Sequence, residues 1–360
     1  MVSKLYIPRN FFSLIIALSL LEKKYCNVFL INKKYFSENQ IRLIKFFLQK
    51  KVKIIFESYY FYADFTKNRL LRFLDYRNQV KKINYDKLFF LIKKFNVRYI
   101  YAGGDSFENN IYFKLNKDIK FYYLEHGVGN FLNFYKCKNN LIEAFKNKLY
   151  LLFKYQINYN GYVGIFRVPH SLRILKSFPA TNFLKTIIFF SKKISFKYKK
   201  EMFFLKKITK KKNLVFLDPP LHETAANQNK FIKEISKILF NTDLIILKNH
   251  PSVTIYRQNE IKLYNFKKKL SRLGLNCFLI RNKKISILPL EMFFFIFKFK
   301  KIITTGSVLS YFSSIYYKDI ENHVFFFKKI NFKYRNFVEL NKNGFDIVTK
   351  IFKDINFSYL

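Results

Sequence analysis

The chain has 360 residues, enough for two domains of ordinary size, and half of them are hydrophobic, which is enough to fill two cores. It carries 67 basic and 23 acidic residues, so its formal net charge is +44, and polyanions such as nucleic acids, anionic lipids and acidic glycans are favoured partners. The lysines are spread along the whole sequence and no zinc-finger, RNA-recognition or basic-zipper motif occurs, which argues against specific nucleic-acid binding.

Cysteine usage and hydropathy point to a protein of a reducing compartment. Cys26, Cys137 and Cys277 lie far apart and form no CxxC pair, so neither a zinc site nor a disulfide framework is expected. The apolar run 11–21 is too short to span a bilayer and lacks the features of a secretory signal. We therefore expect a cytoplasmic protein whose membrane contact, where it has one, is peripheral and on the inner face of the cytoplasmic membrane.

Short apolar runs alternate with longer amphipathic ones in the first half, a pattern typical of parallel α/β folds. Strands are predicted at 5–7, 28–31, 52–56, 98–102 and 121–124, and helices at 10–23, 37–50, 85–95 and 106–115. Ser37 and Ser106 are predicted N-caps. Gly103 and Gly104 indicate a turn after a strand.

The middle of the chain is less regular. A helix is predicted at 141–155 and a strand at 162–168. The stretch 191–212 is rich in lysine with aromatic residues between, and we expect it to end the first domain and to link it to the second. A solvated linker is one interpretation of this stretch, and contact with anionic lipid or an acidic glycan is the other.

The alternation then starts again. Strands are predicted at 214–217, 244–247, 277–280, 302–303 and 323–327, and helices at 227–240, 259–273, 290–299, 307–316 and 344–355. The repeated pattern predicts an α/β protein of two Rossmann-like, doubly wound domains, 1–205 and 206–360, that face a central cleft. In such folds ligands bind beyond the carboxyl ends of the strands.

Polar residues gather at three predicted strand ends, which are the places where a doubly wound domain contacts its ligands. They are Glu125-His126-Gly127 with Gly129, Lys248-Asn249-His250-Pro251, and Thr304-Thr305-Gly306-Ser307 with Ser310. A fourth strand end, Asp218-Pro219-Pro220, is interpreted as a simple turn, with a place in the cleft lining as the alternative.

These motifs, in this order, resemble those of the bacterial sialyltransferases and polysialyltransferases, which carry a paired acidic motif before glycine, then His-Pro, then a paired hydroxyl motif. The flanking Tyr-Leu-Glu-His-Gly and Lys-Asn-His-Pro look like the polysialyltransferase-related branch. Two departures stand out, because His126 occupies the second acidic position and Gly306-Ser307 replaces the paired hydroxyls.

The resemblance implies a GT-B-type, inverting, metal-independent glycosyltransferase. It would move sialic acid, or a related acidic sugar, from a CMP donor to a glycan hydroxyl in cell-surface polysaccharide or lipooligosaccharide synthesis. The first domain would bind the acceptor, an anionic glycan or glycolipid, and the second would bind the nucleotide sugar. No specific nucleic-acid partner is expected.

In the first domain, Glu125 is the predicted base that takes the proton of the acceptor hydroxyl, and the neighbouring glycines leave room for a sugar. A carboxylate in a closing cleft has a raised pKa, which suits this role near neutral pH. His126, Gly127 and Arg9 are predicted acceptor contacts. The alternative is that this segment is a plain turn and that Arg9 is simply solvated.

In the second domain, His250 precedes a proline, so its backbone is extended, and it is the predicted donor of a hydrogen bond or proton to the departing CMP phosphate. Lys248 adds positive charge there, and Pro251 of the same motif is also a predicted nucleotide contact. The alternative is a surface histidine before a helix.

A predicted helix start supplies the remaining nucleotide contacts. Ser307, with Thr305 and Gly306, is expected to bind the phosphate, because free amide groups and the helix dipole favour an anion there. Glu291 is a candidate acceptor of hydrogen bonds from ribose hydroxyls. An ordinary N-cap and an ordinary acidic residue in a first helical turn are the alternatives.

No metal or other cofactor is expected. No Asp-x-Asp pair of the kind that holds Mg²⁺ and a diphosphate follows a predicted strand, and a CMP donor has only one phosphate to neutralise. Two alternatives remain: the same fold with CMP-Kdo or a UDP-sugar as donor, and a non-catalytic envelope protein that binds glycans.

Overall fold

A computed structural model of the protein describes most of the chain, and every structural statement below concerns the described residues. These are 1–33, 35–48, 52–57, 85–103, 118–124, 160–164, 177–179, 182–210, 212–221, 223–249, 253–286, 288–305, 307–327, 349 and 352–360. They divide into two compact units, Met1–Phe183 and Leu184–Leu360, and each unit is built on one parallel sheet.

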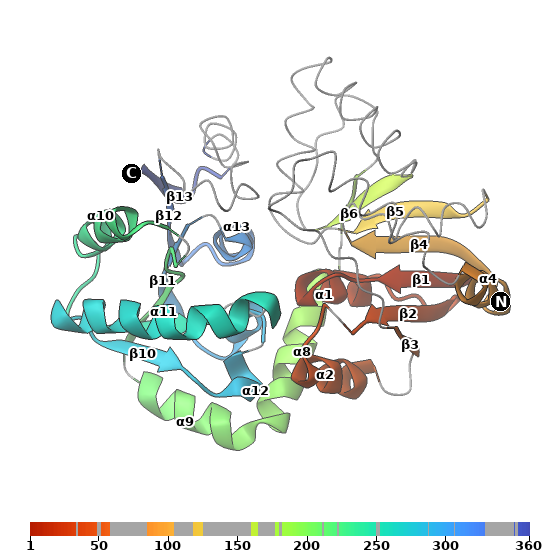
Figure 1. The fold of residues 1–360 in the computed structure, drawn as a ribbon, viewed down its shortest axis with the longest axis horizontal. Coiled ribbons are helices and arrows are strands. Elements are labelled where there is room, and N and C mark those ends of the chain that lie inside the picture. The colour runs from red at the N-terminus through yellow and green to blue at the C-terminus, as the bar shows by residue number, and fades with distance from the viewer. Residues whose placement is uncertain are drawn as a thin grey trace, which may run out of the picture. The chain divides into compact units, whose positions relative to one another are not determined.

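The first unit contains a seven-stranded sheet in the order β3-β2-β1-β4-β5-β6-β7, and every neighbouring pair in it is parallel (Figure 1). The strands are β1 (Ser3–Ile7), β2 (Cys26–Asn32), β3 (Lys53–Glu57), β4 (Val97–Gly103), β5 (Lys120–Leu124), β6 (Gly161–Gly164) and β7 (Ser177–Pro179). The described helices of this unit's sequence are α1 (Phe11–Ser19), α2 (Glu38–Leu48) and α4 (Tyr85–Lys94).

The five strands predicted for this half are confirmed, and β6 confirms the start of the sixth. Residues 165–168 and the predicted helices 106–115 and 141–155 lie outside the described residues, as does the predicted cap Ser106. Ser37 caps α2 as predicted: its Oγ accepts from the amide of Gln40 at 3.2 Å, and its own amide donates to Gln40 Oε1 at 2.9 Å.

Helix α1 ends earlier than predicted, at Ser19 rather than near residue 23. All of its residues are buried, so the apolar run 11–21 is a core helix. Asn10 caps it in a reciprocal capping box with Ser13. The chain then turns at Glu22 to Tyr25 before β2 begins.

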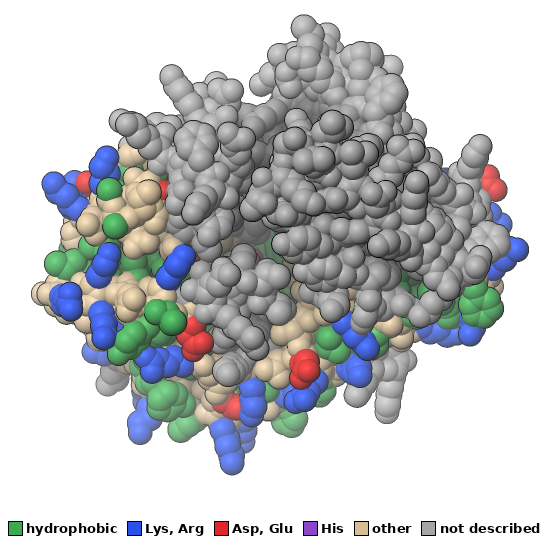
Figure 2. All heavy atoms as spheres, viewed as in Figure 1, with side chains coloured by type: hydrophobic (Ala, Val, Ile, Leu, Met, Phe, Trp, Pro, Cys, Tyr) green, Lys and Arg blue, Asp and Glu red, His purple; other side chains and the backbone are tan. Residues whose placement is uncertain are grey.

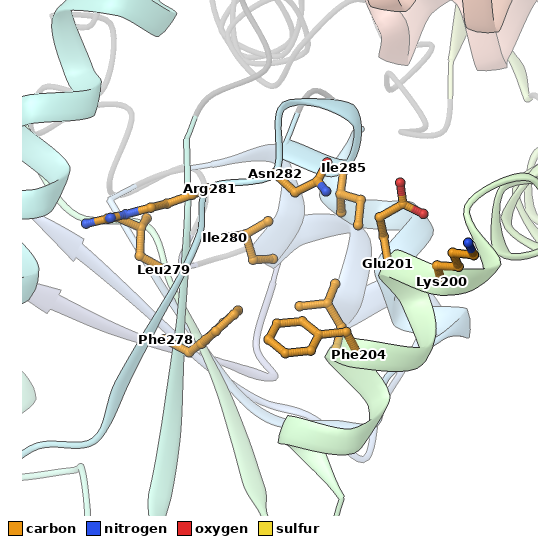
Figure 3. Close-up of a pocket in the computed structure, with 10 residues that line it drawn as sticks. Lys200, Glu201, Phe204, Phe278, Leu279, Ile280, Arg281, Asn282 and Ile285 are labelled. Carbon is orange, nitrogen blue, oxygen red and sulfur yellow. The ribbon is translucent and has the colours of Figure 1, made fainter.

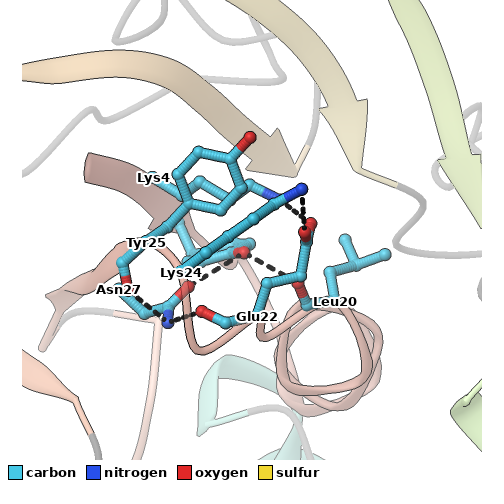
Figure 4. A network of polar contacts seen from close by, with 7 residues as sticks. Lys4, Leu20, Glu22, Lys24, Tyr25 and Asn27 are labelled. Atoms are coloured by element: carbon cyan, nitrogen blue, oxygen red, sulfur yellow. Dashed lines mark hydrogen bonds and ion pairs between the residues drawn. The ribbon is translucent and has the colours of Figure 1, made fainter. Parts of the chain in front are cut away.

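A buried lysine in β1 is accommodated by this turn (Figure 4). The Lys4 ammonium pairs with the Glu22 carboxylate and lies 4.4 Å from the centre of the Tyr25 ring. The Asn27 side-chain amide donates to the carbonyls of Glu22 at 3.0 Å and Tyr25 at 3.2 Å, which holds the turn against β2. The hydrogen bond from Lys4 lowers the pKa of Glu22. A charge inside a strand is thereby paired rather than left alone in the core.

The second unit contains a six-stranded sheet in the order β10-β9-β8-β11-β12-β13, again with all neighbours parallel. The strands are β8 (Asn213–Leu217), β9 (Asp243–Lys248), β10 (Cys277–Ile280), β11 (Phe299–Thr304), β12 (Glu321–Phe326) and β13 (Ile355–Tyr359). The helices are α8 (Phe183–Lys197), α9 (Lys199–Thr209), α10 (Ala225–Ile235), α11 (Val253–Arg272), α12 (Lys283–Ser286), the 3-10 helix η2 (Leu290–Phe295) and α13 (Val308–Tyr316).

Most of the stretch 191–212 is helical, although a linker was predicted there. The buried residues Phe183, Ile187, Phe190 and Ile194 recur at the spacing of one helix face and anchor α8. The predicted domain boundary after residue 205 falls inside α9, whereas the two compact units divide after Phe183.

Two predicted helices of the second half need correction. The segment predicted as a helix at 290–299 is the short η2, and Phe299 already belongs to β11, where it pairs with Leu214 of β8. The helix predicted to reach residue 355 does not, because Ile355 begins β13 and pairs with Asn322 of β12. The remainder of that prediction, apart from residues 349 and 352–354, lies outside the described residues.

Helix α10 starts two residues before its predicted position, since the Thr224 hydroxyl caps it by accepting from the Asn227 amide at 3.2 Å. Helix α11 likewise starts earlier than predicted. The core of this unit lies between the sheet and these helices, where Phe231 packs edge-on against Phe325 at 5.3 Å. Among the helices that the structure describes, none combines the length and apolar character needed to cross a bilayer.

Replacing Glu22 with glutamine removes the charge partner of a buried ammonium, so we expect the protein to unfold more easily at neutral pH. The Glu22 carboxylate is close to half exposed, and solvent screening limits the loss to about 1–2 kcal/mol. Because the folded-state pKa of Glu22 is lowered, this stabilisation is fully present above the ordinary glutamate pKa and is lost as pH falls through the lowered folded value. Urea unfolding at neutral and acidic pH measures the effect.

Lys4→Met is the matched control, because it removes the buried charge itself and leaves Glu22 at the surface. We expect near-wild-type stability from it. If Glu22→Gln has the same free energy of unfolding as the wild type at neutral pH, the ion pair with Glu22 is not what accommodates Lys4.

Candidate functional site

The candidate site of the second unit lies at the carboxyl edge of its sheet. From β8 the chain continues outward through β9 to β10, and from β11 it continues in the opposite direction through β12 to β13. The strand order therefore reverses between β8 and β11. Open parallel sheets bind ligands beyond the carboxyl ends of the strands at such a reversal.

Three central strands end in polar residues at this edge. Asp218 follows β8, Lys248 is the last residue of β9, and Thr304 is the last residue of β11. The amide of Asp218 donates to the carbonyl of Ile303 at 2.9 Å, which ties the ends of β8 and β11 together. The Lys248 side chain is buried, and its Nζ donates to the carbonyl of Asn249 at 3.1 Å.

An ammonium group and two carboxyl groups interact electrostatically here. Burial lowers the pKa of Lys248 to about 7, against the opposing effect of Glu291 and Asp218. Burial raises the pKa of Asp218 to about 6 and also raises that of Glu291, with Lys248 opposing both shifts. We name these residues the Lys248 cluster. Groups that titrate near neutral pH are typical of functional sites, and also occur in structural ion networks.

The members of the Lys248 cluster differ in exposure. Lys248 and Glu291 are buried at 6% and 8% exposed, while the Asp218 residue is partly exposed. Burial of the Asp218 carboxyl group raises its pKa, so all three charged groups of the cluster are shielded from solvent even though part of the Asp218 residue is exposed.

Ser307 begins α13 as predicted. Its hydroxyl accepts from the amide of Leu309 at 3.4 Å, so it is the N-cap of the helix. Behind it, the fully buried hydroxyls of Thr304 and Ser310 are 2.8 Å apart and hold the start of α13 against the end of β11. Thr305, between these anchors, is partly exposed. Contact of Ser307 and Thr305 with a phosphate stays a prediction.

The surroundings of Glu291 and Asp218 in the structure differ from those that the sequence alone indicated. Glu291 lies in η2 and is a buried electrostatic partner of Lys248, so its predicted contact with ribose hydroxyls stays untested. Asp218 was interpreted as part of a turn and was left out of the site. The signal that identifies it is a carboxylate directly after a buried strand, followed by two prolines that end the strand.

In the first unit, Arg9 lies just beyond the carboxyl end of β1, where the strand order reverses between β1 and β4. Its guanidinium donates to the Tyr35 hydroxyl at 3.4 Å and lies 5.2 Å from the centre of that ring. Arg9 is partly exposed at this edge. Its predicted contact with an acceptor stays a prediction.

Six predicted site residues lie outside the described residues: Glu125, His126, Gly127, His250, Pro251 and Gly306. The described residues beside them are at strand ends. Leu124 ends β5, and Asn249 follows the end of β9. The roles of the six residues rest on the sequence alone.

A pocket of about 560 Å³ lies elsewhere in the second unit, between α9 and β10 (Figure 3). It is mostly apolar at its base, where the rings of Phe204 and Phe278 are 6.4 Å apart. Ile280, which also lines the pocket, is the register partner of Lys248 across β10 and β9. The remaining lining residues are Lys200, Glu201, Leu205, Leu279, Arg281, Asn282 and Ile285, none of which was predicted as a site residue.

The described residues contain no group of three histidine, cysteine, aspartate or glutamate side chains that could hold a metal ion.

Comparison with known proteins identifies the fold. No family model matches the sequence, and no curated protein is similar to it in sequence. The UGT2 protein of Phytolacca americana superposes with a TM-score of 0.53 at 10% identity, over 99% of this chain and 86% of that one. A UDP-glucosyltransferase of Polygonum tinctorium superposes with a TM-score of 0.51 at 10% identity, over 89% and 79%. The UDP-GlcNAc 2-epimerase of Neisseria meningitidis gives 0.48 at 12%, over 86% and 79%.

At these identities the first two likenesses show the fold alone. It is an α/β fold of the GT-B type with two parallel-sheet domains, as predicted.

Proposed function

We propose that the protein is an inverting glycosyltransferase whose second unit binds a nucleotide-sugar donor at the carboxyl edge of its sheet. The observation that carries this proposal is the Lys248 cluster at the reversal of strand order. A buried ammonium at the end of β9 and the N-terminus of α13 after β11, with only β8 between these two strands, suit the phosphate of a nucleotide. The GT-B-type fold and its likeness to a UDP-glucosyltransferase support sugar transfer as the reaction class.

CMP-sialic acid, or another CMP-linked acidic sugar, is our proposed donor. Its support is the resemblance of the three sequence motifs to bacterial sialyltransferases. A single phosphate also demands less neutralising charge than a diphosphate, so Lys248 and the amide groups at the start of α13 would suffice without a metal ion. The fold likeness to a UDP-glucosyltransferase keeps a UDP-sugar as the second candidate.

In the proposed reaction, the acceptor hydroxyl oxygen bonds to the anomeric carbon of the donor sugar while the bond from that carbon to the phosphate oxygen breaks. Glu125 takes the hydroxyl proton, and His250 donates a hydrogen bond or proton to the departing phosphate. Attack opposite the leaving group inverts the configuration. Ser307, Thr305 and Gly306 would hold the phosphate during this step.

The proposed acceptor is an anionic glycan or glycolipid that contacts Arg9, His126 and Gly127. The net charge of +44 attracts such an acceptor over distances comparable to the Debye length. Synthesis of cell-surface polysaccharide or lipooligosaccharide is the process that would use such a transfer.

A nucleotide panel separates the donor classes. We expect CMP to raise the melting temperature of the protein, with and without EDTA, because a ligand at a hundred times its Kd stabilises the folded state by about 2.7 kcal/mol. UDP and GDP should have smaller effects. Stabilisation by UDP alone, or only in the presence of a divalent metal, would replace the CMP assignment with a UDP-sugar.

The same panel tests the Lys248 cluster. Lys248→Met should lose the CMP effect, whereas Lys230→Met, which removes an exposed lysine from α10, should keep it. An undiminished CMP shift in Lys248→Met would place the phosphate elsewhere.

Glu125→Gln tests the proposed base. We expect the rate of CMP release in the presence of acceptor to fall by roughly a hundredfold or more, because proton removal by a positioned base contributes about that factor. CMP binding should persist, since the substituted group acts on the acceptor. Glu234→Gln, on the exposed face of α10, is the matched control. Equal rates in wild type and Glu125→Gln would remove Glu125 from the mechanism.

A further inference from the structure

Helices α8 and α9 carry aromatic residues on faces that point to solvent. In α8, Phe189 and Phe196 are 47% and 83% exposed, opposite the buried stripe that anchors the helix. In α9, Phe203 is 70% exposed, opposite the buried Met202 and Leu205. Of the six exposed phenylalanines in the described part of the chain, these two helices hold four. Four exposed rings on two consecutive helices are more than the single scattered apolar residues of an ordinary protein surface.

Lysines surround each of these rings. On α8, Lys185 and Lys192 share the exposed face with Phe189 and Phe196 at spacings of three and four residues. The Lys193 ammonium lies 4.5 Å from the centre of the Phe189 ring. On α9, Phe203 has lysines three and four positions away on both sides, namely Lys199, Lys200, Lys206 and Lys207.

The charge of this surface is almost entirely positive. Residues 183–210 contain nine lysines and a single acidic residue, Glu201, which pairs with Lys284 at 3.3 Å. Figure 2 shows blue and green side chains side by side along the lower edge of the described surface, where α9 lies in Figure 1. Aromatic and cationic groups are thus interleaved rather than separated.

We propose that this α8–α9 face docks onto an anionic lipid surface. Phe189, Phe196 and Phe203 would enter the boundary between headgroups and acyl chains, and the lysines around them would reach the lipid phosphates along their flexible stems. A bilayer interface satisfies both kinds of side chain at once. An acidic glycan would engage the lysines, but it offers no apolar layer into which three phenylalanine rings can insert.

The geometry fits a helix pair that lies on the membrane rather than one that crosses it. Each helix has one buried face, so only the opposite face is available. Phe204 is excluded from the inserting set, because its ring lies beside Phe278 in the pocket between α9 and β10 (Figure 3). This docking surface does not depend on the proposed transferase activity.

The absence of tryptophan from the whole sequence allows a direct test. Phe203→Trp and Phe196→Trp each place a single tryptophan on the face, and Phe240→Trp places one at a comparably exposed position outside it. With vesicles of equal parts phosphatidylglycerol and phosphatidylcholine, we expect a blue shift and quenching by brominated acyl chains for the first two variants and neither for the third. If the Phe203→Trp protein binds the vesicles but its tryptophan still emits at the wavelength of a water-exposed indole, the proposal is wrong.

Sedimentation with the same vesicles tests whether the phenylalanine rings contribute to the binding free energy or whether the positive charge alone accounts for it. The triple variant Phe189→Ser, Phe196→Ser, Phe203→Ser keeps every lysine, and we expect each substitution to weaken binding roughly fivefold to tenfold. The triple variant Phe240→Ser, Ile261→Ser, Leu273→Ser removes exposed apolar residues elsewhere in the second unit and should bind as wild type does. Circular dichroism and the melting temperature, each compared with the wild type, check that both variants are folded.

Three outcomes would contradict membrane docking by this face. The first is that the two triple variants bind the vesicles equally well. The second is that the wild type binds vesicles of phosphatidylcholine alone as tightly as it binds the anionic vesicles. The third is that single-stranded DNA, but not the vesicles, shields the Phe203→Trp fluorophore from water. The last outcome would assign the rings to base stacking.

Discussion

The candidate site depends on the electrostatic interaction of Lys248, which is buried at the end of a central strand, with two carboxyl groups. An ammonium inside a protein is costly unless anionic groups face it, and Glu291 and Asp218 supply those groups from two other segments of the second unit. The cluster joins β8, β9 and η2 where the strand order reverses. The proposed donor binding requires that the phosphate of the ligand take the place of these carboxyl groups as the partner of the ammonium.

The strands and the fold class could be predicted from the sequence because buried parallel strands leave a local signal. β1 and β9 are short apolar runs between polar segments, and both were found within two residues of their bounds. β7 and β13 were missed for different reasons. β7 has only three residues and ends in proline, and β13 is defined by its pairing with β12, a non-local contact that the local pattern does not contain.

The positions of the candidate site residues could be predicted from the sequence only where a polar residue directly follows a strand or begins a helix. Lys248 and Ser307 stand directly at a strand end and a helix start, and the sequence showed both. Asp218 was set aside because Asp-Pro-Pro reads as a turn, and its electrostatic link to Lys248 depends on burial that no local pattern reports. In α8 and α9 the density of lysines suggested a linker and obscured the apolar spacing of Phe183, Ile187, Phe190 and Ile194, which was present all along.

The most direct test of donor binding at the Lys248 cluster is an NMR titration of the lysine side-chain amines with and without CMP. We expect one amine that titrates near pH 7 in the free protein and is absent from Lys248→Met. Because a bound phosphate favours the ammonium form, saturating CMP should move that titration to higher pH, with uptake of a proton on binding near neutrality. A Lys248 amine whose titration is unchanged or moves to lower pH in saturating CMP would contradict the account.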